Sequence, residues 1–324
     1  MNEGTGQRCT IGVDLGATTV KSGVVDSRGE ILRQVVADTR ANEGPEIVVR
    51  QILSTIESLL THESRSDIGG IGIGAPGVVS LDGNTVEYPP NFSNWTSFEL
   101  GSAVSGACHL PVRVENDANV AAIAEAKFGA GIDEKDFIFV IWGTGVGGGI
   151  IVDRKIFRGP HGGAGEIGHI SIDYHGPQCN CGNHGCIESY IGQRYLSQRT
   201  KLILERSHER GKPSLIERLV EGNLDAIEPR VISMAAQQGD PTARAILEEA
   251  GQLLGYALAA VINLLDIRVA VIGGGISAAP DFVFDAIQSG ARSRALKSHQ
   301  PHICILRAKL GNAAGIIGAA SLVM

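Results

Sequence analysis

The first forty residues alternate between short apolar runs and turns that contain glycine or charge. Between Cys9 and Asp38 the runs CTIGVDL, TVKSGVVD and EILRQVVAD are rich in β-branched residues. The turns between them fall at Gly16-Ala17 and at Ser27-Arg28-Gly29. Runs of this length and composition, punctuated in this way, predict three consecutive strands that form a meander.

The apolar spacing then changes from two residues to three or four. After Gly44-Pro45 apolar residues recur at helical intervals as far as Leu60, which predicts an amphipathic helix over 45–60. The same reasoning predicts further strands over 68–75, 112–115, 137–142, 149–153, 269–272 and 303–307. It predicts further helices over 98–108, 116–128, 245–265, 282–291 and 314–323, with residues 189–251 mainly helical.

One pattern occurs twice along the chain. The segments GVDLGATTVKSGVVDSRGEIL and VIWGTGVGGGIIVDRKIF each contain a strand, a Gly/Thr-rich turn, a strand, a turn with Asp, and the start of a third strand. A repeat of this size indicates two halves related by duplication. We expect the tight turn of each hairpin to face a common cleft that holds phosphates.

Composition narrows the class of protein. A chain of 324 residues is long enough for two domains, each with its own core. The formal net charge of -7 argues against nucleic acid or an anionic membrane as partner and favours small molecules. No apolar run has the length of a signal peptide or a membrane span, so we expect a cytoplasmic protein.

Three of the six cysteines stand within the segment QCNCGNHGC, as Cys179, Cys181 and Cys186. Such crowding fits either a disulfide framework or a tetrahedral zinc site. The other cysteines are scattered singly and no secretory signal is present, which favours zinc. His169 completes a Cys3His set with no position left for a catalytic water, so the metal would be structural. His184 lies inside the cluster and competes with His169, and spacing alone does not decide between them.

The glycine-rich segment Gly143–Gly148 matches G-x-G-x-x-G, but a strand-like run, GIIVDRKIF, follows it where a dinucleotide site needs a helix. A Gly/Thr-rich hairpin turn instead presents backbone N–H groups to phosphate oxygens. The first hairpin offers the same with Gly16, Thr18 and Lys21. Asp14 beside it either holds hydrated Mg²⁺ or only satisfies the N–H groups of the turn.

Asn116-Asp117 follows a predicted strand and opens a predicted helix. A carboxylate there is suited to accept a proton from an attacking hydroxyl, and either residue is also suited to cap the helix. Glu166, His169 and Glu188 flank the cysteine-rich loop. Two carboxylates and an imidazole are suited to bind vicinal sugar hydroxyls.

At these residues the sequence resembles the ROK family of sugar kinases and sugar-responsive repressors, a branch of the actin-like ATPase superfamily. The segments that carry the resemblance are DLGATTVK, GAPG, ENDANVAA, GTGVGGGI, GGAGEIGHI, CNCGNHGCIE and IGGGIS. The resemblance implies an α/β fold with two actin-like (ribonuclease H-like) domains around a deep cleft and a zinc-binding loop. It implies a small N-terminal domain of residues 1–115, to which a helix over 313–324 returns, and a large domain of residues 116–312 with the zinc loop and an oligomerisation surface.

The resemblance also implies roles for particular residues. Asp117 resembles the family's catalytic base, and the sugar-contacting set is matched by Asn91, Asn116, Glu166, His169 and Glu188. The first phosphate motif is matched by Asp14, Gly16, Thr18 and Lys21, the second by Gly143, Thr144 and Gly145, and the wall near the adenosine by Gly274 and Gly275. The family's zinc set is matched by His169, Cys179, Cys181 and Cys186.

We therefore expect an ATP-dependent hexose kinase, with glucose as the expected sugar, Mg²⁺ and a structural Zn²⁺ as cofactors, and a homodimer or homotetramer as assembly. The alternative is an N-acylhexosamine kinase, acting on N-acetylmannosamine or N-acetylglucosamine. A catalytically silent sugar sensor is a further alternative, although Asp117 and both phosphate turns are intact. For a repressor we expect a preceding winged-helix domain, and the first predicted strand begins near Cys9.

Overall fold

The structure, a computed structural model, describes residues 9–61, 67–208 and 214–324. The chain divides into two units: unit 1 contains the described residues up to 135 with 149–165 and 309–324, and unit 2 contains 136–148 and 166–308. This division differs from the predicted domains of 1–115 and 116–312. Residues 116–135 belong to unit 1 because the helix over 117–128 packs on the last helix and on the first sheet.

Unit 1 is built on a five-stranded sheet in the order β3-β2-β1-β4-β8. Its strands are β1 (Cys9–Leu15), β2 (Thr19–Val25), β3 (Ile31–Asp38), β4 (Ile68–Ala75) and β8 (Val112–Asn116). The first three form the predicted antiparallel meander, and β4 and β8 run parallel to β1. Asp14 pairs with Gly74, and Ala75 pairs with Asn116, so the carboxyl ends of three parallel strands meet at one edge.

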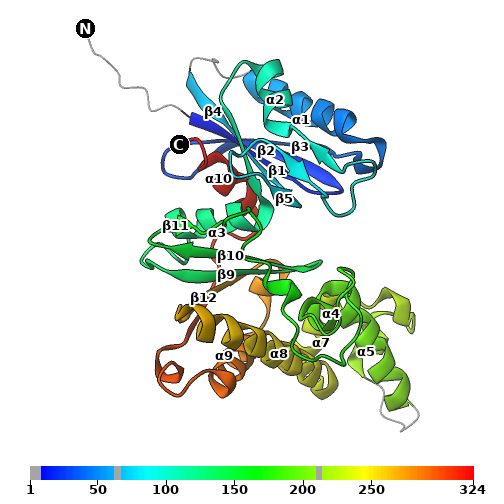
Figure 1. Cartoon of the computed structure of the whole chain (residues 1–324). Coiled ribbons are helices and arrows are strands. Elements are labelled where there is room, and N and C mark those ends of the chain that lie inside the picture. Colours follow the sequence, from blue (N-terminus) through cyan, green and yellow to red (C-terminus); the bar gives the residue numbers. More distant parts are fainter. Residues whose placement is uncertain (1–8, 62–66, 209–213) are drawn as a thin grey trace. The chain divides into compact units, whose positions relative to one another are not determined.

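Different helices cover the two faces of this sheet (Figure 1). Ile11 and Val13 join the core formed with α1 (Pro45–Leu60) and α2 (Leu100–Cys108). The opposite face carries glycines beneath α10 (Ala314–Ala320), which also packs on α3 (Asp117–Phe128). A Cβ on Gly12 would lie 1.9 Å from the Ile316 carbonyl oxygen, and one on Gly72 would lie 1.7 Å from that of Ala319. Alternating Ile/Val and Gly along these strands therefore gives one thick apolar face and one face that a helix backbone can touch.

A three-stranded sheet in the order β5-β6-β7 lies between β4 and α2 in the sequence. Its strands are β5 (Val78–Val79), β6 (Val86–Glu87) and β7 (Ser97–Phe98). The predicted helix over 98–108 is therefore wrong at its start, because Phe98 ends β7 and α2 begins at Leu100. Trp95 is buried beside this sheet and its indole N–H donates to the Val86 carbonyl oxygen over 3.0 Å.

A second five-stranded sheet has the order β11-β10-β9-β12-β13. Its strands are β9 (Phe137–Trp142), β10 (Val146–Val152), β11 (Lys155–Ile156), β12 (Val269–Gly273) and β13 (Cys304–Arg307). Because β10 begins at Val146, Gly147 and Gly148 belong to a strand. The predicted loop over 143–148 is thus a shorter turn, which the Gly143 N–H closes by donating to the Gly145 carbonyl oxygen over 3.0 Å.

The helices of unit 2 are α4 (Glu188–Ile191), α5 (Gln193–His208), α6 (Leu215–Leu219), α7 (Pro229–Gln237), α8 (Pro241–Leu265) and α9 (Asp281–Arg294). Short 3-10 helices in the two units are η1 (Ala41–Glu43), η3 (Ile167–His169), η4 (Leu224–Ala226), η5 (Gly275–Ala278), η6 (Gln300–His302) and η7 (Gly311–Ala313). Figure 1 shows α8 and α9 side by side, and α7 also packs on α8. Within the described ranges α8 is the one helix long and apolar enough to cross a membrane, yet most of its apolar window is buried, as in a core helix.

The contact between α10 and the first sheet predicts a specific sensitivity. We expect Gly72→Ala to lower the free energy of unfolding by about 1–3 kcal/mol or more, because the added methyl meets helix backbone that has no room to move. Urea denaturation of the purified proteins measures the change.

The matched control is Gly106→Ala in α2, where an added Cβ meets nothing within 4 Å. We expect that variant to gain about 0.5–1 kcal/mol, because alanine is the better helix residue. Equal stabilities of the two variants would contradict the close approach of α10 to the sheet.

Candidate active site

In unit 1 the predicted first phosphate motif lies at the carboxyl edge of the sheet. Asp14 stands near the end of β1, and the Lys21 ammonium lies 3.5 Å from its carboxylate. The turn between β1 and β2 is closed by the Gly16 N–H, which donates to the Thr19 carbonyl oxygen over 3.0 Å, and leaves Thr18 exposed. The structure thus brings Asp14, Gly16, Thr18 and Lys21 to the end of a parallel strand, where open α/β sheets bind ligands.

Burial raises the pKa of Asp14, and the charge and hydrogen bond of Lys21 partly offset this effect. A carboxylate with few water neighbours costs free energy unless a cation compensates it. Lys21 supplies only part of the compensation, so the position favours a second positive charge.

Asn116 and Asp117 occupy the next part of the same edge, and the structure gives them different roles. The Asn116 side-chain oxygen accepts the Ala118 N–H over 2.9 Å and the Asn119 N–H over 3.2 Å, so Asn116 is the cap of α3. Its amide group donates to the Gly77 carbonyl oxygen over 3.0 Å. Asp117, the first residue of the helix, is exposed. Asn116 therefore takes the predicted capping role, and the Asp117 carboxylate accepts the Ala118 N–H as well, over 2.8 Å.

Asn91 lies in the loop that follows β6. It is exposed and has a φ of 66°, a left-handed conformation that asparagine tolerates. The same loop approaches the turn at Gly77, where an added Cβ would lie 2.9 Å from the Pro89 Cα. Because Asn116 also binds the Gly77 carbonyl, one turn supports both the Asn91 loop and the start of α3.

In unit 2 the structure brings the second predicted phosphate turn next to Glu188. The Val146 N–H donates to a Glu188 carboxylate oxygen over 2.9 Å, and a Cβ on Gly145 would lie 2.5 Å from the same oxygen. The carbonyl oxygens of Gly143 and Thr144 accept the Gln193 N–H at the start of α5. Glu188, predicted to contact sugar, therefore also supports the turn over 143–145.

The predicted adenosine wall lies beside that turn. Gly274 has a φ of 84°, and a Cβ there would lie 2.4 Å from the Trp142 carbonyl oxygen. The site of a Cβ on Gly143 is 4.0 Å from the Gly275 nitrogen. Two glycine turns from distant parts of the sequence therefore lie close together, and a side chain at Gly274 would meet the Trp142 backbone.

The cysteine-rich loop gathers four possible ligand groups. The ring nitrogen of His169 and the sulfurs of Cys179, Cys181 and Cys186 all lie within 4.8 Å of one another. The His184 ring instead lies 3.3 Å from the Gly176 carbonyl oxygen, so His169 is the fourth member of the cluster. All six cysteines fall within the described ranges and are free thiols. Burial and the neighbouring thiols raise the pKa of Cys186 to about 12.

His169 and Glu188 connect this cluster with the predicted sugar contacts. The Nδ1 of His169 lies 3.8 Å from the Cys179 sulfur, and its Nε2 lies 3.9 Å from a Glu166 carboxylate oxygen. The second Glu188 oxygen lies 4.0 Å from the Cys179 sulfur. The loop thus holds three of the predicted sugar-contacting residues in one part of unit 2.

Sequence reasoning missed three charged residues that lie next to predicted site residues within each unit. Glu115 is buried and pairs with Arg158 in unit 1. In unit 2 Arg307 donates to the carbonyl oxygens of Ser277 and Ala279, to the Asp281 carboxylate, and stacks on Phe284. It thereby supports η5, which follows Gly274. The one sequence signal for Glu115 is a charge at the end of an apolar strand, and the two arginines have no local signal.

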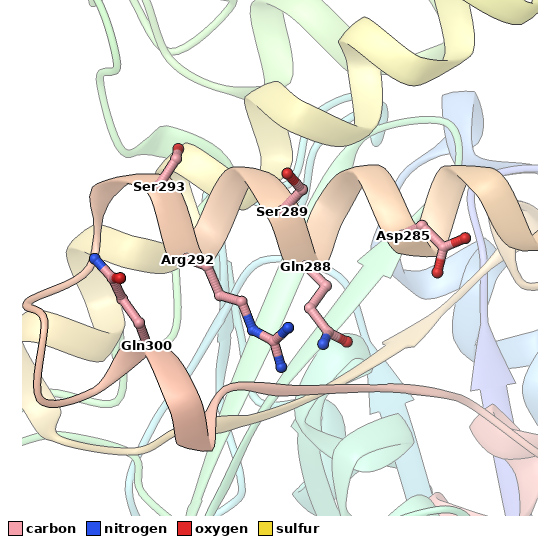
Figure 2. A pocket seen from close by; sticks show the side chains of 6 residues that line it. All are labelled: Asp285, Gln288, Ser289, Arg292, Ser293 and Gln300. Carbon is pink, nitrogen blue, oxygen red and sulfur yellow. The ribbon is translucent and has the colours of Figure 1, made fainter.

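An open groove of about 470 Å³ lies elsewhere in unit 2 and contains none of the predicted site residues. It is lined by Asp285, Gln288, Ser289, Arg292, Ser293 and Gln300. Figure 2 shows the two serine side chains on the opposite side of α9 from Gln288 and Arg292, so the polar groups do not converge. The Arg292 guanidinium is also engaged with the Ile303 carbonyl oxygen over 3.1 Å.

Comparison with known proteins covers nearly the whole chain. The sequence model of the ROK family matches residues 10–324. A glucokinase from Streptomyces coelicolor is 39% identical over 315 residues, which cover 97% of this chain and 96% of that protein. A xylose repressor from Caldicellulosiruptor bescii is 30% identical over 97% of this chain, but the match covers 77% of the repressor.

A solved structure matches this chain over a similar share of its length. The ROK family glucokinase from Streptomyces griseus, crystallised in complex with glucose and AMPPNP, is 37% identical and superposes with a TM-score of 0.84. The match covers 97% of this chain and 99% of that one.

The raised pKa of Asp14 predicts how stability depends on pH. The folded protein binds the Asp14 proton more tightly than the unfolded chain, so this contribution favours folding below the unfolded pKa and is lost as pH rises through the folded pKa. We expect Asp14→Asn to raise the unfolding temperature of the ligand-free protein at neutral pH. The gain should vanish in acid, below both pKa values.

Asp26→Asn is the control with opposite sign. Hydrogen bonds from the Glu30 N–H and from Arg28 lower the pKa of Asp26, so its contribution is present above the unfolded pKa and is lost as pH falls through the folded pKa. This variant should lose stability at neutral pH. A loss of stability in both variants would contradict the assignment for Asp14.

Proposed function

This chain belongs to the ROK family, and we propose that it is an ATP-dependent kinase that converts glucose to glucose 6-phosphate. The observation that carries the proposal is the exposure of Asp117 at the start of α3. Asn116 caps the helix, and the exposed Asp117 carboxylate lies at the same sheet edge as Asp14 and Lys21. A proton acceptor beside a phosphate motif is what transfer to an alcohol requires.

In this proposal Asp117 accepts the proton of the glucose 6-hydroxyl as that oxygen attacks the γ-phosphate. Asn91, Asn116, Glu166, His169 and Glu188 bind the remaining hydroxyls and orient the sugar. Carboxylate oxygens accept more than one hydrogen bond each, which suits vicinal hydroxyl groups. The face of the sugar that these residues bind determines which hydroxyl lies next to Asp117.

The glycine turns bind the nucleotide. Gly16, Thr18 and Lys21 in unit 1 and Gly143, Thr144 and Gly145 in unit 2 bind phosphate oxygens through N–H, hydroxyl and ammonium groups. Gly274 and Gly275 form the wall for the adenosine. Asp14 would hold Mg²⁺, which its partly uncompensated charge favours, and such an ion would supply positive charge to the phosphates.

The cysteine-rich loop fits a structural zinc ion. Ligands about 2.3 Å from a common tetrahedral centre lie about 3.8 Å apart. The Cys181 and Cys186 sulfurs are 3.7 Å apart, and the Cys179 sulfur and His169 nitrogen are 3.8 Å apart. Burial raises the pKa of Cys179 and Cys186, whereas at Cys181 hydrogen bonds outweigh burial and lower the pKa. His169, Cys179, Cys181 and Cys186 would hold the ion and fix Glu166 and Glu188.

The remaining parts of the proposal are the cellular location, the assembly and the arrangement of the fold. We infer a cytoplasmic protein with two actin-like domains that assembles as a homodimer or homotetramer. The second candidate substrate is an N-acylhexosamine. The 39% identity to a glucokinase favours glucose over it.

A coupled assay of ADP release with ATP and Mg²⁺ tests the function against glucose, mannose, fructose, N-acetylglucosamine and N-acetylmannosamine. We expect the highest kcat/KM with glucose. Asp117→Asn should lower kcat with glucose by about 10²–10⁴-fold and leave glucose affinity little changed, because it removes only the proton acceptor.

Asp133→Asn, an exposed carboxylate of unit 1 outside the site, is the matched control and should keep normal turnover. Preference for an acetamido sugar would replace glucose by the second candidate. Near-normal turnover of Asp117→Asn would remove Asp117 as the base, and no turnover of the wild-type protein with any sugar would leave a sensor.

The zinc proposal is tested by metal analysis of freshly purified, reduced protein. We expect about one zinc ion per chain, and its loss in Cys181→Ala together with lower thermal stability and weaker glucose binding. Cys304→Ala changes an exposed cysteine on β13, away from the cluster, and should retain the ion. Wild-type protein without zinc would refute the site.

A further inference from the structure

Glu115 is an ionisable residue in the core of unit 1. It is 3% exposed and directly precedes Asn116 and Asp117 at the end of β8. One carboxylate oxygen accepts the Asn116 backbone N–H over 2.9 Å and the Asn119 side-chain amide over 3.0 Å. The other oxygen accepts the Nε–H of Arg158. Both oxygens are therefore occupied, by three donors from three different residues.

Arg158 reaches Glu115 from a segment far along the chain. It follows β11, 43 residues after Glu115. The Arg158 carbonyl oxygen accepts the Ala164 N–H over 3.2 Å, which closes the glycine-rich loop over 158–164. Two residues after this loop comes Glu166. The ion pair thus joins the root of that loop to the strand end that bears Asn116 and Asp117.

We propose that Glu115 and Arg158 are a positioning pair for phosphoryl transfer, which holds the start of α3 so that the Asp117 carboxylate points at the reacting hydroxyl. The inference rests on the proposed function of Asp117. Neither residue touches the reacting atoms in this proposal, and both act through the backbone of Asn116.

The physical basis of this proposal is that several hydrogen bonds fix the junction between β8 and α3. The peptide between Glu115 and Asn116 is held by the Glu115 carboxylate itself, through the Asn116 N–H. The first turn of α3 is held a second time, through Asn119. Arg158 binds the second carboxylate oxygen and so further restricts rotation of the carboxylate group. A charged donor is the strongest available tie for a buried carboxylate.

The substitution Glu115→Gln keeps the shape of the side chain but cannot accept hydrogen bonds from all three donors. A glutamine has one acceptor oxygen, so its amide N–H₂ must face either Arg158 or the Asn116 and Asn119 donors. In each case a donor meets a donor, and the junction shifts. Because a displacement of about 1 Å in a reacting group costs up to about 10²-fold, we expect kcat to fall about 10- to 100-fold.

The KM for glucose should change less than kcat, because Asn116 is the one proposed hydroxyl-binding residue that Glu115 contacts. Arg158→Lys should retain part of the rate, since an ammonium keeps the charge but loses the fixed geometry of the guanidinium. Arg113→Lys, an exposed arginine on β8, is the matched control and should behave as wild type. Thermal unfolding of each variant shows that the compared proteins are folded.

The decisive measurement is a double-mutant cycle with Asp117→Asn. If Glu115 acts through Asp117, Glu115→Gln should lower kcat strongly in the wild-type background and by less than about twofold in the Asp117→Asn background. An equal loss in both backgrounds would overturn the positioning role, as would a Glu115→Gln variant with normal kcat and reduced stability.

The cycle also separates this inference from the function on which it rests. Wild-type turnover that Asp117→Asn abolishes supports the kinase, whatever Glu115→Gln does. Wild-type protein without sugar kinase activity overturns the proposed function itself. Should Glu115→Gln fail to fold, the same cycle is measured with Arg158→Lys, whose changed side chain is partly exposed.

Discussion

The close approach of α10 to the glycine face of the first sheet is the contact on which unit 1 depends. The helix backbone lies directly on Gly12 of β1 and Gly72 of β4, and its Gly318 lies against the backbone of Val120 in α3. Its first turn meets the Asp14 carboxylate at Gly315. The strand that bears Asp14 and the helix that begins at Asp117 therefore rest on one short element from the far end of the chain. The positions of Asp14 and of the start of α3 are therefore set by close backbone packing, because glycines leave no side chain that could change its rotamer to relieve a shift.

Compensation of buried charge is the second organising constraint. Glu125 of α3 is fully buried and accepts the backbone N–H groups of Ala130, Lys309 and Leu310, which fixes the segment that enters α10. Glu115 is satisfied by Arg158 and by two donors of the α3 start. In unit 2 Glu188 contacts both the turn over 143–145 and the cysteine cluster. Because an unpaired carboxylate in the interior is costly, each of these acids holds two chain segments in a defined place.

The local sequence pattern was sufficient to predict regular strands and helices. It was insufficient where a contact with a distant segment decides where an element begins or ends. The meander over 9–38 and the helix over 45–60 are confirmed as predicted, since alternation and helical spacing are properties of neighbours in sequence. The start of α2 was missed because the segment over 97–98 pairs with β6 instead. The glycines at 147 and 148 were read as loop, yet they belong to β10.

By itself, the sequence determined the two phosphate-type turns, the Cys3His candidate ligands and the Asn116-Asp117 pair, because each is a short motif whose chemistry lies within a few residues. Tertiary structure alone decided that His169 rather than His184 joins the cysteines. It also decided that Glu115 is tied to Arg158, and that residues 116–135 belong to unit 1. Each of these depends on how separate segments of the chain pack against one another, and not on the order of residues within a motif.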